Sequence, residues 1–261
     1  EEDGNVFWNA PFGKGRPGWH IECSAMSMKN LGETIDIHTG GLDLIFPHHT
    51  NEIAQSEGVT DKKFVKYWMH SGFVNMENEK MAKSVGNIIT LDEIIKNGFS
   101  PISYRYFLLG IHYRKQTNFS WDAISGAQNA IEKLYAKFLD LGEILGDVNT
   151  NLKEKFVNAL EQDLNTSTAL SLIWEILESS SLVDADKKAT LLDFDKVLGL
   201  GLNKITQTPV PKEVKILVEK RESARNNKNW EEADKLRQEI NGLGYEVLDT
   251  ENGVKIRKLH K

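Results

Sequence analysis

The character of the sequence changes near residue 90, and this change limits the folds open to the chain. Before residue 90, apolar and β-branched segments such as TIDIHTGG and KYWMHSGFVNM alternate with glycines and with helical stretches. That alternation is typical of an α/β domain. After residue 90, helical periodicity dominates. We therefore predict an α/β domain followed by a mainly helical region.

The clearest helical period lies in SWDAISGAQNAIEKLYAKFLDLGEIL, where Ser120 or Asp122 can cap the helix. Its apolar residues recur at helical spacing: Ile124, Ala127, Ile131, Leu134, Tyr135, Phe138 and Leu145. DLNTSTALSLIWEILESSSLV and KKATLLDFDKVLGL repeat the pattern after short polar breaks. Residues 120–202 are predicted to form an antiparallel helical bundle.

A polar, proline-containing linker, NKITQTPVP, precedes a third region. There we predict two charged amphipathic helices, near 211–226 and 230–242, and then two strands joined at Asn252-Gly253, a favoured hairpin turn. Residues 211–261 carry 12 Lys and Arg against 10 Asp and Glu, while the rest of the chain is acidic. Any contact with nucleic acid must therefore come from local arrangement and not from bulk charge.

Composition excludes several classes of protein. With 261 residues, 40% of them hydrophobic, the chain can bury a core and form roughly two domains. No apolar run approaches the ~18 residues of a membrane span, and the acidic start EEDGNVFWN matches neither a signal peptide nor a transit peptide. We expect a cytoplasmic protein. The single cysteine, Cys23, excludes an internal disulfide framework.

Two adjacent histidines follow a proline in FPHHTNEIAQSEG, residues 46–58. Because Pro47 is tolerated in a first helical turn and no breaker follows until Gly58, residues 47–57 are predicted to be helical. His48 and Glu52 would then lie one turn apart on one face, with His49 about 100° away. Such a pair can bind a metal ion, but it is more often a solvated surface contact.

Two further stretches contain reactive side chains. GRPGWHIECSAMS, residues 15–27, places Trp19 four residues before Cys23, and EKMAKSVGN, residues 79–87, is a lysine-rich loop ending in glycine. Taken alone, Cys23 could equally be a small buried hydrophobe. For Lys80 and Lys83 taken alone, a solvated loop is the favoured alternative.

In their order and spacing, GRPGWHIECSAM, DIHTGGLDLIFPHHTNEIAQSE and KMAKS resemble the cysteinyl-tRNA synthetases, which are class I aminoacyl-tRNA synthetases. The resemblance continues through YRYFLLGIHYRKQTNFSWDAI and KNWEEADKLRQEINGLGYEVLDT. It implies the second half of an α/β Rossmann-like catalytic domain over 1–90, a stem-contact connection over 91–120, a tRNA-binding α-helical bundle over 121–205, and a small mixed α/β anticodon-binding domain over 206–261.

The resemblance also implies that Cys23, His48 and Glu52 are three of the four ligands of a zinc ion. Thiolate, imidazole and carboxylate groups suit zinc, which has no redox chemistry to damage a thiol. Zinc that binds the substrate thiolate would reject serine, whereas a pocket that sorts by shape alone discriminates near-isosteres only about 10²-fold.

Other positions match the family's active site. Trp19 and His38 correspond to residues lining the amino-acid pocket, and Asp43 is a candidate for the substrate ammonium, although it could equally form a turn. Gly40 and Gly41 fit a place where the backbone approaches ATP.

KMAKS resembles the class I KMSKS loop, with Ala82 replacing the serine. By that resemblance Lys80 and Lys83 are catalytic, and Lys83 binds the phosphates of ATP, which enters with Mg²⁺.

The resemblance therefore predicts a cysteine–tRNA ligase that acts as a monomer on tRNA(Cys), L-cysteine and ATP. The family's HIGH-type motif and first zinc cysteine do not occur in the sequence. We expect both in a preceding portion, where that cysteine would be the fourth zinc ligand. The alternatives are a cysteine ligase of low-molecular-weight thiol biosynthesis and a non-catalytic zinc- or tRNA-binding fragment.

The anticodon would be bound by a few side chains of the third region, because its bases are single-stranded. The candidates are Arg225, Trp230, Arg237 and Arg257. For Trp230, packing between the two predicted helices is the favoured alternative to stacking on a base.

Overall fold

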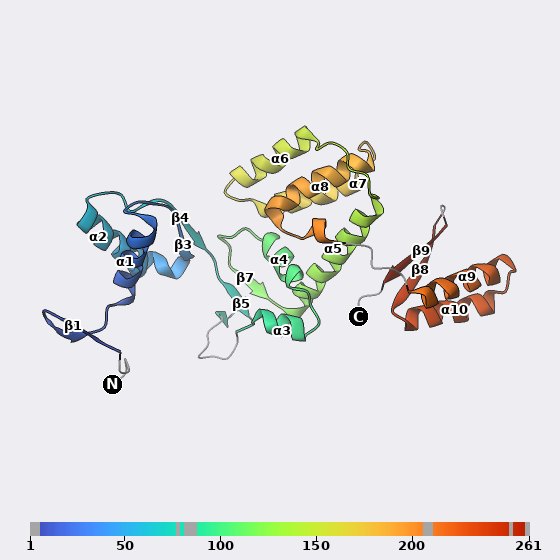
Figure 1. Ribbon diagram of the computed structural model, residues 1–261, viewed down its shortest axis with the longest axis horizontal. Helices are drawn as coiled ribbons and strands as arrows, with labels where there is room; N and C mark the ends of the chain where they lie inside the picture. Colours follow the sequence, from blue (N-terminus) through green and yellow to red (C-terminus); the bar gives the residue numbers. More distant parts are fainter. Residues whose placement is uncertain (1–5, 77–78, 81–87, 206–210, 251–252, 259–261) are drawn as a thin grey trace. The chain divides into compact units, whose positions relative to one another are not determined.

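The computed structural model describes residues 6–76, 79–80, 88–205, 211–250 and 253–258 (Figure 1). The chain divides into two compact units, Glu1–Leu200 and Gly201–Lys261. Among the described residues, none of the helices combines the length and the apolar character that crossing a membrane would need.

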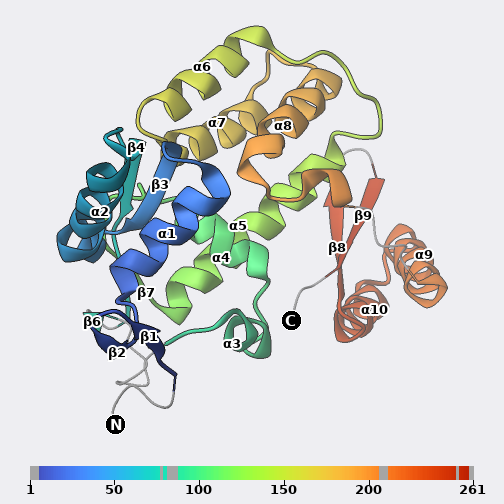
Figure 2. The same cartoon turned by 60° about the vertical axis from the view of Figure 1, so that its left-hand side comes forward.

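The first unit begins with the α/β region that the sequence predicts. An antiparallel pair, β1 (Trp8–Ala10) and β2 (Gly13–Gly15), precedes α1 (Trp19–Leu31). The parallel strands β3 (Ile35–Gly41) and β4 (Val65–Ser71) follow, joined by a crossover that contains α2 (Thr50–Thr60). Figure 2 shows α1 and α2 beside this strand pair. The core below them is formed by Ile35, Phe64 and Val65, with Met28, Ile53 and Trp68 packed against it.

A connecting region follows the strand pair. It contains a three-stranded sheet in the order β6 (Glu79–Lys80), β5 (Val74–Met76), β7 (Thr117–Phe119), and two helices, α3 (Leu91–Lys96) and α4 (Pro101–Leu109). A capping box begins α3, because Thr90 and Glu93 each accept a hydrogen bond from the other's backbone N–H. Ile94, Phe119 and Ile124 form the core that joins this region to the next helix.

The predicted helical bundle is confirmed as α5 (Trp121–Asp140), α6 (Thr150–Glu161), α7 (Thr166–Glu178) and α8 (Asp184–Leu198). Ser120, one of the two proposed caps, accepts a hydrogen bond from the N–H of Ala123 at 3.1 Å. The apolar period buries Ile124, Ala127, Ile131, Leu134 and Phe138. The prediction that Leu145 belongs to this helix is wrong, because Leu145 lies beyond the end of α5 and is exposed.

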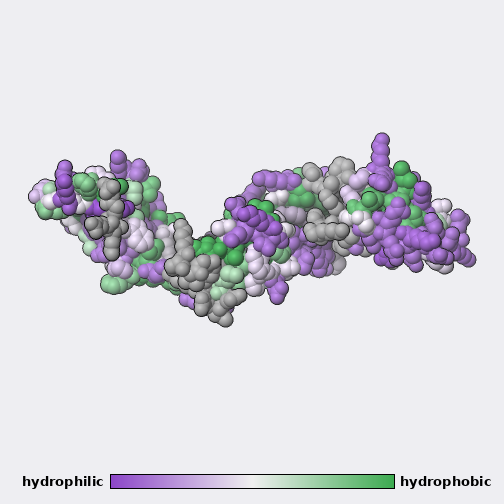
Figure 3. Space-filling model, turned by 90° about the horizontal axis from the view of Figure 1, so that it is seen from below, coloured by the Kyte–Doolittle hydropathy of each residue, from purple (hydrophilic) through white to green (hydrophobic). Residues whose placement is uncertain are grey.

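The second unit confirms the predicted helix pair and hairpin. It contains α9 (Lys212–Asn226), α10 (Trp230–Gly242), β8 (Tyr245–Thr250) and β9 (Gly253–Lys258), after a short 3₁₀ turn, η3 (Leu202–Lys204). Asn252 of the predicted turn lies outside the described residues. Apolar side chains of α9, α10 and β8 form the core, whereas the surface of the helices in the right-hand part of Figure 3 is mostly hydrophilic.

Candidate metal centre

The two adjacent histidines lie in the first helical turn, which continues directly into α2 (Thr50–Thr60). Phe46 has an extended backbone (φ −133°, ψ 132°) within the short helical segment η2 (Ile45–His49), whereas His49 already has helical dihedral angles (φ −66°, ψ −32°). The predicted range 47–57 is thus helical, and the helix continues through Gly58 to Thr60, beyond the predicted end.

Helical spacing brings both histidines toward Glu52, which lies at i+4 from His48 and at i+3 from His49. The distance from Nε2 to Glu52 Oε2 is 3.7 Å for His48 and 3.9 Å for His49. The predicted one-turn spacing of His48 and Glu52 is therefore confirmed. His49, which was expected about 100° away from His48 and outside the pair, also reaches the carboxylate. His38, on β3, also reaches Glu52, with Nε2 3.4 Å from Oε2.

Cys23 joins this cluster from α1, which packs against α2. The ligand atoms of Cys23, His48 and Glu52 all lie within 4.8 Å of one another. The ligand atoms of His38, His49 and Glu52 also all lie within 4.8 Å of one another. The structure thus brings together the three ligands that the sequence proposes, and it adds two imidazoles around the same carboxylate.

Burial makes this cluster electrostatically unusual. Glu52 is 0% exposed, and neither of its carboxylate oxygens has a hydrogen-bond partner among the described residues. Burial raises the pKa of Glu52 to about 7. Burial and the charge of Glu52 raise the pKa of Cys23. Burial, followed by neighbouring histidines, lowers the pKa of His48, and it lowers that of His49 to about 4. The cluster therefore combines neutral imidazoles with the Glu52 carboxyl and the Cys23 thiol, whose negatively charged forms have no positively charged partner in the cluster.

Further histidines contact the cluster from outside. His20 Nδ1 lies 2.7 Å from His48 Nδ1, and His70 Nε2 lies 2.8 Å from His49 Nδ1. Sequence reasoning missed both residues. The only signal for His20 was its place within GWHIEC, next to Cys23 in the chain.

The position of His70 depends on strand register. The parallel pairing sets His70 opposite Gly40. A Cβ on Gly40 would lie 2.6 Å from His49 Cε1, so a glycine is needed for His49 to lie against this strand. Gly40 thus has a packing role that the sequence did not indicate.

Two other residues were predicted for the amino-acid pocket. Trp19 is 59% exposed, and the centroid of its ring is 4.3 Å from that of His48. Asp43 lies in the 3₁₀ turn η1 (Leu42–Leu44), with Oδ1 2.6 Å from the point where a Cβ on Gly41 would be.

The other predicted residues are partly described. Lys80 lies in β6 and Arg257 in β9, without described side chains, and Lys83 lies outside the described residues. In the second unit, Arg225 Cζ is 6.0 Å from the centre of the Trp230 ring. Trp230 is 59% exposed, so the expectation that it packs between the two helices is wrong. Arg237 is exposed on α10.

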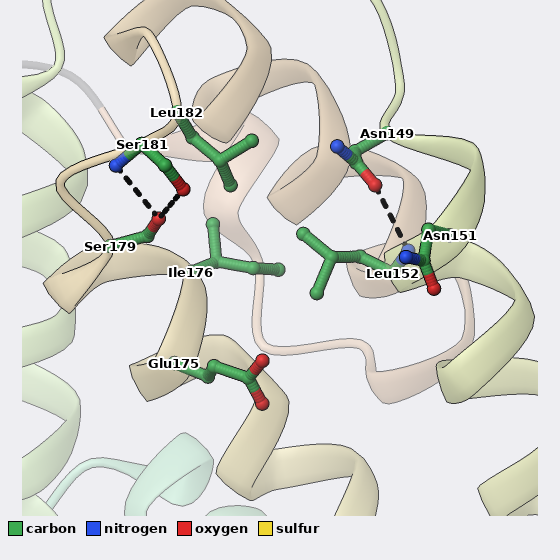
Figure 4. A pocket seen from close by; sticks show the side chains of 8 residues that line it. All are labelled: Asn149, Asn151, Leu152, Glu175, Ile176, Ser179, Ser181 and Leu182. Atoms are coloured by element: carbon green, nitrogen blue, oxygen red, sulfur yellow. Dashed lines mark hydrogen bonds between the residues drawn. The ribbon is translucent and has the colours of Figure 1, made fainter.

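A small pocket in the bundle is unrelated to these residues (Figure 4). It is lined by Asn149, Asn151, Leu152, Glu175, Ile176, Ser179, Ser181 and Leu182. Its polar groups serve local structure. Asn149 caps α6 by accepting from the N–H of Leu152 at 3.0 Å, and the hydroxyls of Ser179 and Ser181 are 3.1 Å apart.

The comparisons with known proteins agree with these observations. Residues 1–129 match the tRNA synthetases class I (C) catalytic domain, and residues 208–257 match the cysteinyl-tRNA ligase anticodon binding domain. The chain belongs to the cysteinyl-tRNA synthetase family. It is 43% identical over 99% of its length to a cysteine–tRNA ligase of Caldicellulosiruptor saccharolyticus, and 41% identical over 97% to one of Oenococcus oeni. It spans 60% and 58% of the lengths of these cysteinyl-tRNA synthetases.

A solved structure supports the fold alone. The chain resembles the LeuRS of Agrobacterium radiobacter K84 in a ternary complex with tRNA, with a TM-score of 0.50 and 14% identity. The match covers 63% of this chain and 26% of that one. The α/β region followed by helices is therefore an arrangement found in another aminoacyl-tRNA synthetase.

Proposed function

We propose that this protein is a cysteine–tRNA ligase, which uses ATP to convert L-cysteine to cysteinyl-adenylate and transfers the cysteinyl group to tRNA(Cys). Membership of the family supports this reaction. The observation that carries the proposal is the buried Glu52 carboxylate, which has no hydrogen-bond partner among the described residues and faces Cys23 and His48.

The residues of this cluster fit zinc. A thiolate, an imidazole and a carboxylate are common zinc ligands, and the ion would supply the positive charge that Glu52 and the Cys23 thiolate lack. Neutral imidazoles, favoured here by burial, are the form that binds metal. When bound, zinc would hold the thiolate of the substrate cysteine and so exclude serine.

The side chains around the cluster would position the amino acid. Trp19 and His38 would line the pocket, because the first contacts His48 and the second reaches Glu52. Asp43 would bind the substrate ammonium. Gly40 and Gly41 end β3 at the carboxyl edge of the strand pair, where nucleotides bind in α/β folds.

Lys80 and Lys83 would stabilise charge on the ATP phosphates, bound with Mg²⁺, as pyrophosphate leaves. Lys83→Ala should lower the rate of adenylate formation by on the order of 10²-fold with little change in cysteine affinity, as expected for a group that acts mainly in the transition state. Rapid-quench measurement of adenylate formation would test this role, and an unchanged rate would rule it out.

The rest of the chain would bind tRNA. Residues 91–120 would contact the acceptor stem and residues 121–205 would form the tRNA-binding bundle. The anticodon would meet residues 206–261 through Arg225, Trp230, Arg237 and Arg257. The match of residues 208–257 to an anticodon-binding domain favours this arrangement over a ligase that passes cysteine to an amino sugar.

The deciding experiment is cysteine-dependent exchange of pyrophosphate into ATP by the full-length gene product, with serine as the competing substrate. We expect exchange with cysteine and almost none with serine. Adding tRNA(Cys) or an amino-sugar acceptor then identifies the acceptor. Absence of exchange would favour a non-catalytic fragment, and transfer to the amino sugar would favour thiol biosynthesis.

A further inference from the structure

One carboxylate of the bundle holds a loop of the connecting region. Asp163, in the short connection between α6 and α7, accepts a hydrogen bond from Tyr113 Oη at 2.6 Å. It also accepts from Arg114 Nε at 2.6 Å and Nη2 at 3.2 Å. His112 Nε2 lies 3.7 Å from the same carboxylate. Three consecutive residues of the loop between α4 and β7 therefore converge on Asp163.

The backbone around Asp163 is strained. Asp163 and Leu164 have φ values of 55° and 54°, in the left-handed region that residues other than glycine seldom adopt. Two such residues in succession persist only where surrounding contacts hold them. The contacts from Tyr113 and Arg114 are suited to that task, because together they bond both oxygens of the Asp163 carboxylate.

The opposite side of the loop holds the end of β4. The N–H of Gly72 donates to the carbonyl of Tyr113 at 2.8 Å, and the N–H of Thr117 donates to the carbonyl of Phe73 at 2.9 Å. A Cβ on Gly72 would lie only 2.5 Å from the Lys115 carbonyl oxygen. The loop and the strand end are thus in direct backbone contact.

The strand end leads directly to the metal centre. His70 lies two residues before Gly72 and contacts His49, which in turn lies 3.9 Å from Glu52. Burial and the charge of Arg114 lower the pKa of His70, as expected if Arg114 lies near that ring. A continuous chain of contacts therefore joins Asp163 to the cluster.

We propose that Asp163 is a positioning residue that couples the helical bundle to the histidines of the metal centre. This inference rests on the proposed function, because it takes cysteine activation as the reaction being positioned. The Asp163 carboxylate fixes the loop, the loop fixes Gly72, and Gly72 fixes the strand end that carries His70. When Asp163 is removed, the strand end becomes free to shift relative to Glu52.

Three variants separate the carboxylate from the backbone strain. Asp163→Gly keeps the positive φ and removes the carboxylate. Asp163→Asn keeps the φ preference and an acceptor for Tyr113, but it removes the charge that Arg114 binds. Leu164→Gly relieves the neighbouring strain and leaves Asp163 in place, so it is the matched control.

The experiment measures cysteine-dependent pyrophosphate exchange in the full-length gene product. Asp163→Gly should lower kcat about tenfold, because small displacements of positioned groups cost up to about 10²-fold. Asp163→Asn should have a smaller effect, and Leu164→Gly should match the wild type. KM for cysteine should stay within about twofold of the wild type, because the metal ligands and the pocket residues remain.

Hydrogen exchange supplies a readout that does not depend on activity. In Asp163→Gly, the amides of Gly72 and Thr117 should exchange faster while those of α8 stay protected. A merely local role would confine the change to the connection between α6 and α7, and this would overturn the coupling. An unchanged kcat, or a fall that only follows the folded fraction, would do the same.

A double-mutant cycle with Arg114→Ala tests the pathway. Non-additive losses of kcat in Arg114→Ala and Asp163→Gly would support the coupling, and additive losses would overturn it. If wild-type protein exchanges with cysteine and Asp163→Gly is equally active, only the coupling fails. If the wild type shows no cysteine-dependent exchange, the proposed function fails and the coupling fails with it.

Discussion

Among the described residues, Arg221 and Glu52 are both almost fully buried, but only Arg221 is paired through hydrogen bonds. Arg221, 2% exposed in the second unit, donates to both oxygens of Asp249 at 2.9 Å, and only its Nε lacks a partner among the described residues. Glu52, 0% exposed in the first unit, has no hydrogen bond to either oxygen among those residues.

The difference separates a charge that belongs to the fold from one that belongs to a site. A buried charge is costly unless it is paired, so an arginine that holds a carboxylate in two places is explained by the chain itself. The Glu52 carboxylate, which is surrounded by imidazoles and a thiol, has no comparable partner of opposite charge in the described residues. Its environment points to a ligand that lies outside the chain.

The largest expected effect is on metal binding at Glu52. Glu52→Gln should weaken zinc binding by at least about 10²-fold. Loss of a residue that only hydrogen-bonds to a metal ligand already costs about 10- to 100-fold in metal affinity, and Glu52 is proposed as a ligand itself. Above about pH 7 and without metal, the same variant should unfold at a higher temperature than the parent, because it removes a buried carboxylate that has no hydrogen-bond partner among the described residues. Chelator competition and thermal unfolding measure the two effects.

Glu57→Gln on the same helix is the matched control for that experiment. Glu57 Oε1 accepts a hydrogen bond from the N–H of Phe64 at 3.0 Å, and a glutamine oxygen can replace it. Zinc affinity should therefore be unchanged. Equal zinc affinities for Glu52→Gln and Glu57→Gln would contradict the assignment of Glu52 as a ligand.

In the second unit, removing the partner of the buried charge should cost more stability than removing the buried charge itself. Asp249→Asn leaves the Arg221 guanidinium buried without a counter-charge and should destabilise this unit by about 2 kcal/mol. This is less than for a fully buried pair, because the Asp249 side chain is 41% exposed. Arg221→Met should cost less, because it removes the buried charge itself. Hydrogen exchange of α9 amides measures the stability loss in both variants. An equal or larger loss for Arg221→Met would contradict the view that the unpaired buried charge is what destabilises the unit.

The same pair predicts a pH dependence. Hydrogen bonds from Arg221, and then its charge and those of Arg225 and Arg237, lower the pKa of Asp249 despite its partial burial. A depressed carboxyl pKa stabilises the folded state above the unfolded value of about 3.9, and this contribution is lost as the pH falls through and below that value. The second unit should therefore lose stability below about pH 4.

Asp249→Asn is the control for this titration, because it removes the group that gains the proton. Amide exchange in α9 can be compared between pH 6 and pH 3.5 for both proteins. The loss on acidification should be larger in the parent than in the variant. An equal loss in both would assign the acid sensitivity to other carboxyl groups.

Local periodicity predicted much of this molecule. The helices of the bundle follow from the 3.6-residue period, and the one-turn spacing of His48 and Glu52 is local as well. The resemblance to a known family added Cys23, which is distant in the chain. Its place beside Glu52 depends on how α1 packs against α2.

What the sequence could not indicate depends on strand register. His70 reaches His49 because β3 and β4 pair with His70 opposite Gly40. Register leaves no periodic signal, so the contact between His70 and the cluster was missed. His49, by contrast, lies at i,i+3 from Glu52 on helical backbone, and this spacing was present in the sequence.

The smallest expected effect on the fold comes from Trp230. Because its ring is 59% exposed, Trp230→Ala should change the stability of the second unit by less than about 0.5 kcal/mol, whereas Leu236→Ala in the core should cost about 2 kcal/mol or more. If the ring stacks on an anticodon base, Trp230→Ala should raise the KM for tRNA about tenfold, since stacking contributes about 1–3 kcal/mol per base. Cysteine-dependent pyrophosphate exchange should be unchanged, because that reaction involves no tRNA. An unchanged KM for tRNA would show that an exposed aromatic ring here, unlike the unpartnered carboxylate of Glu52, does not mark a binding site.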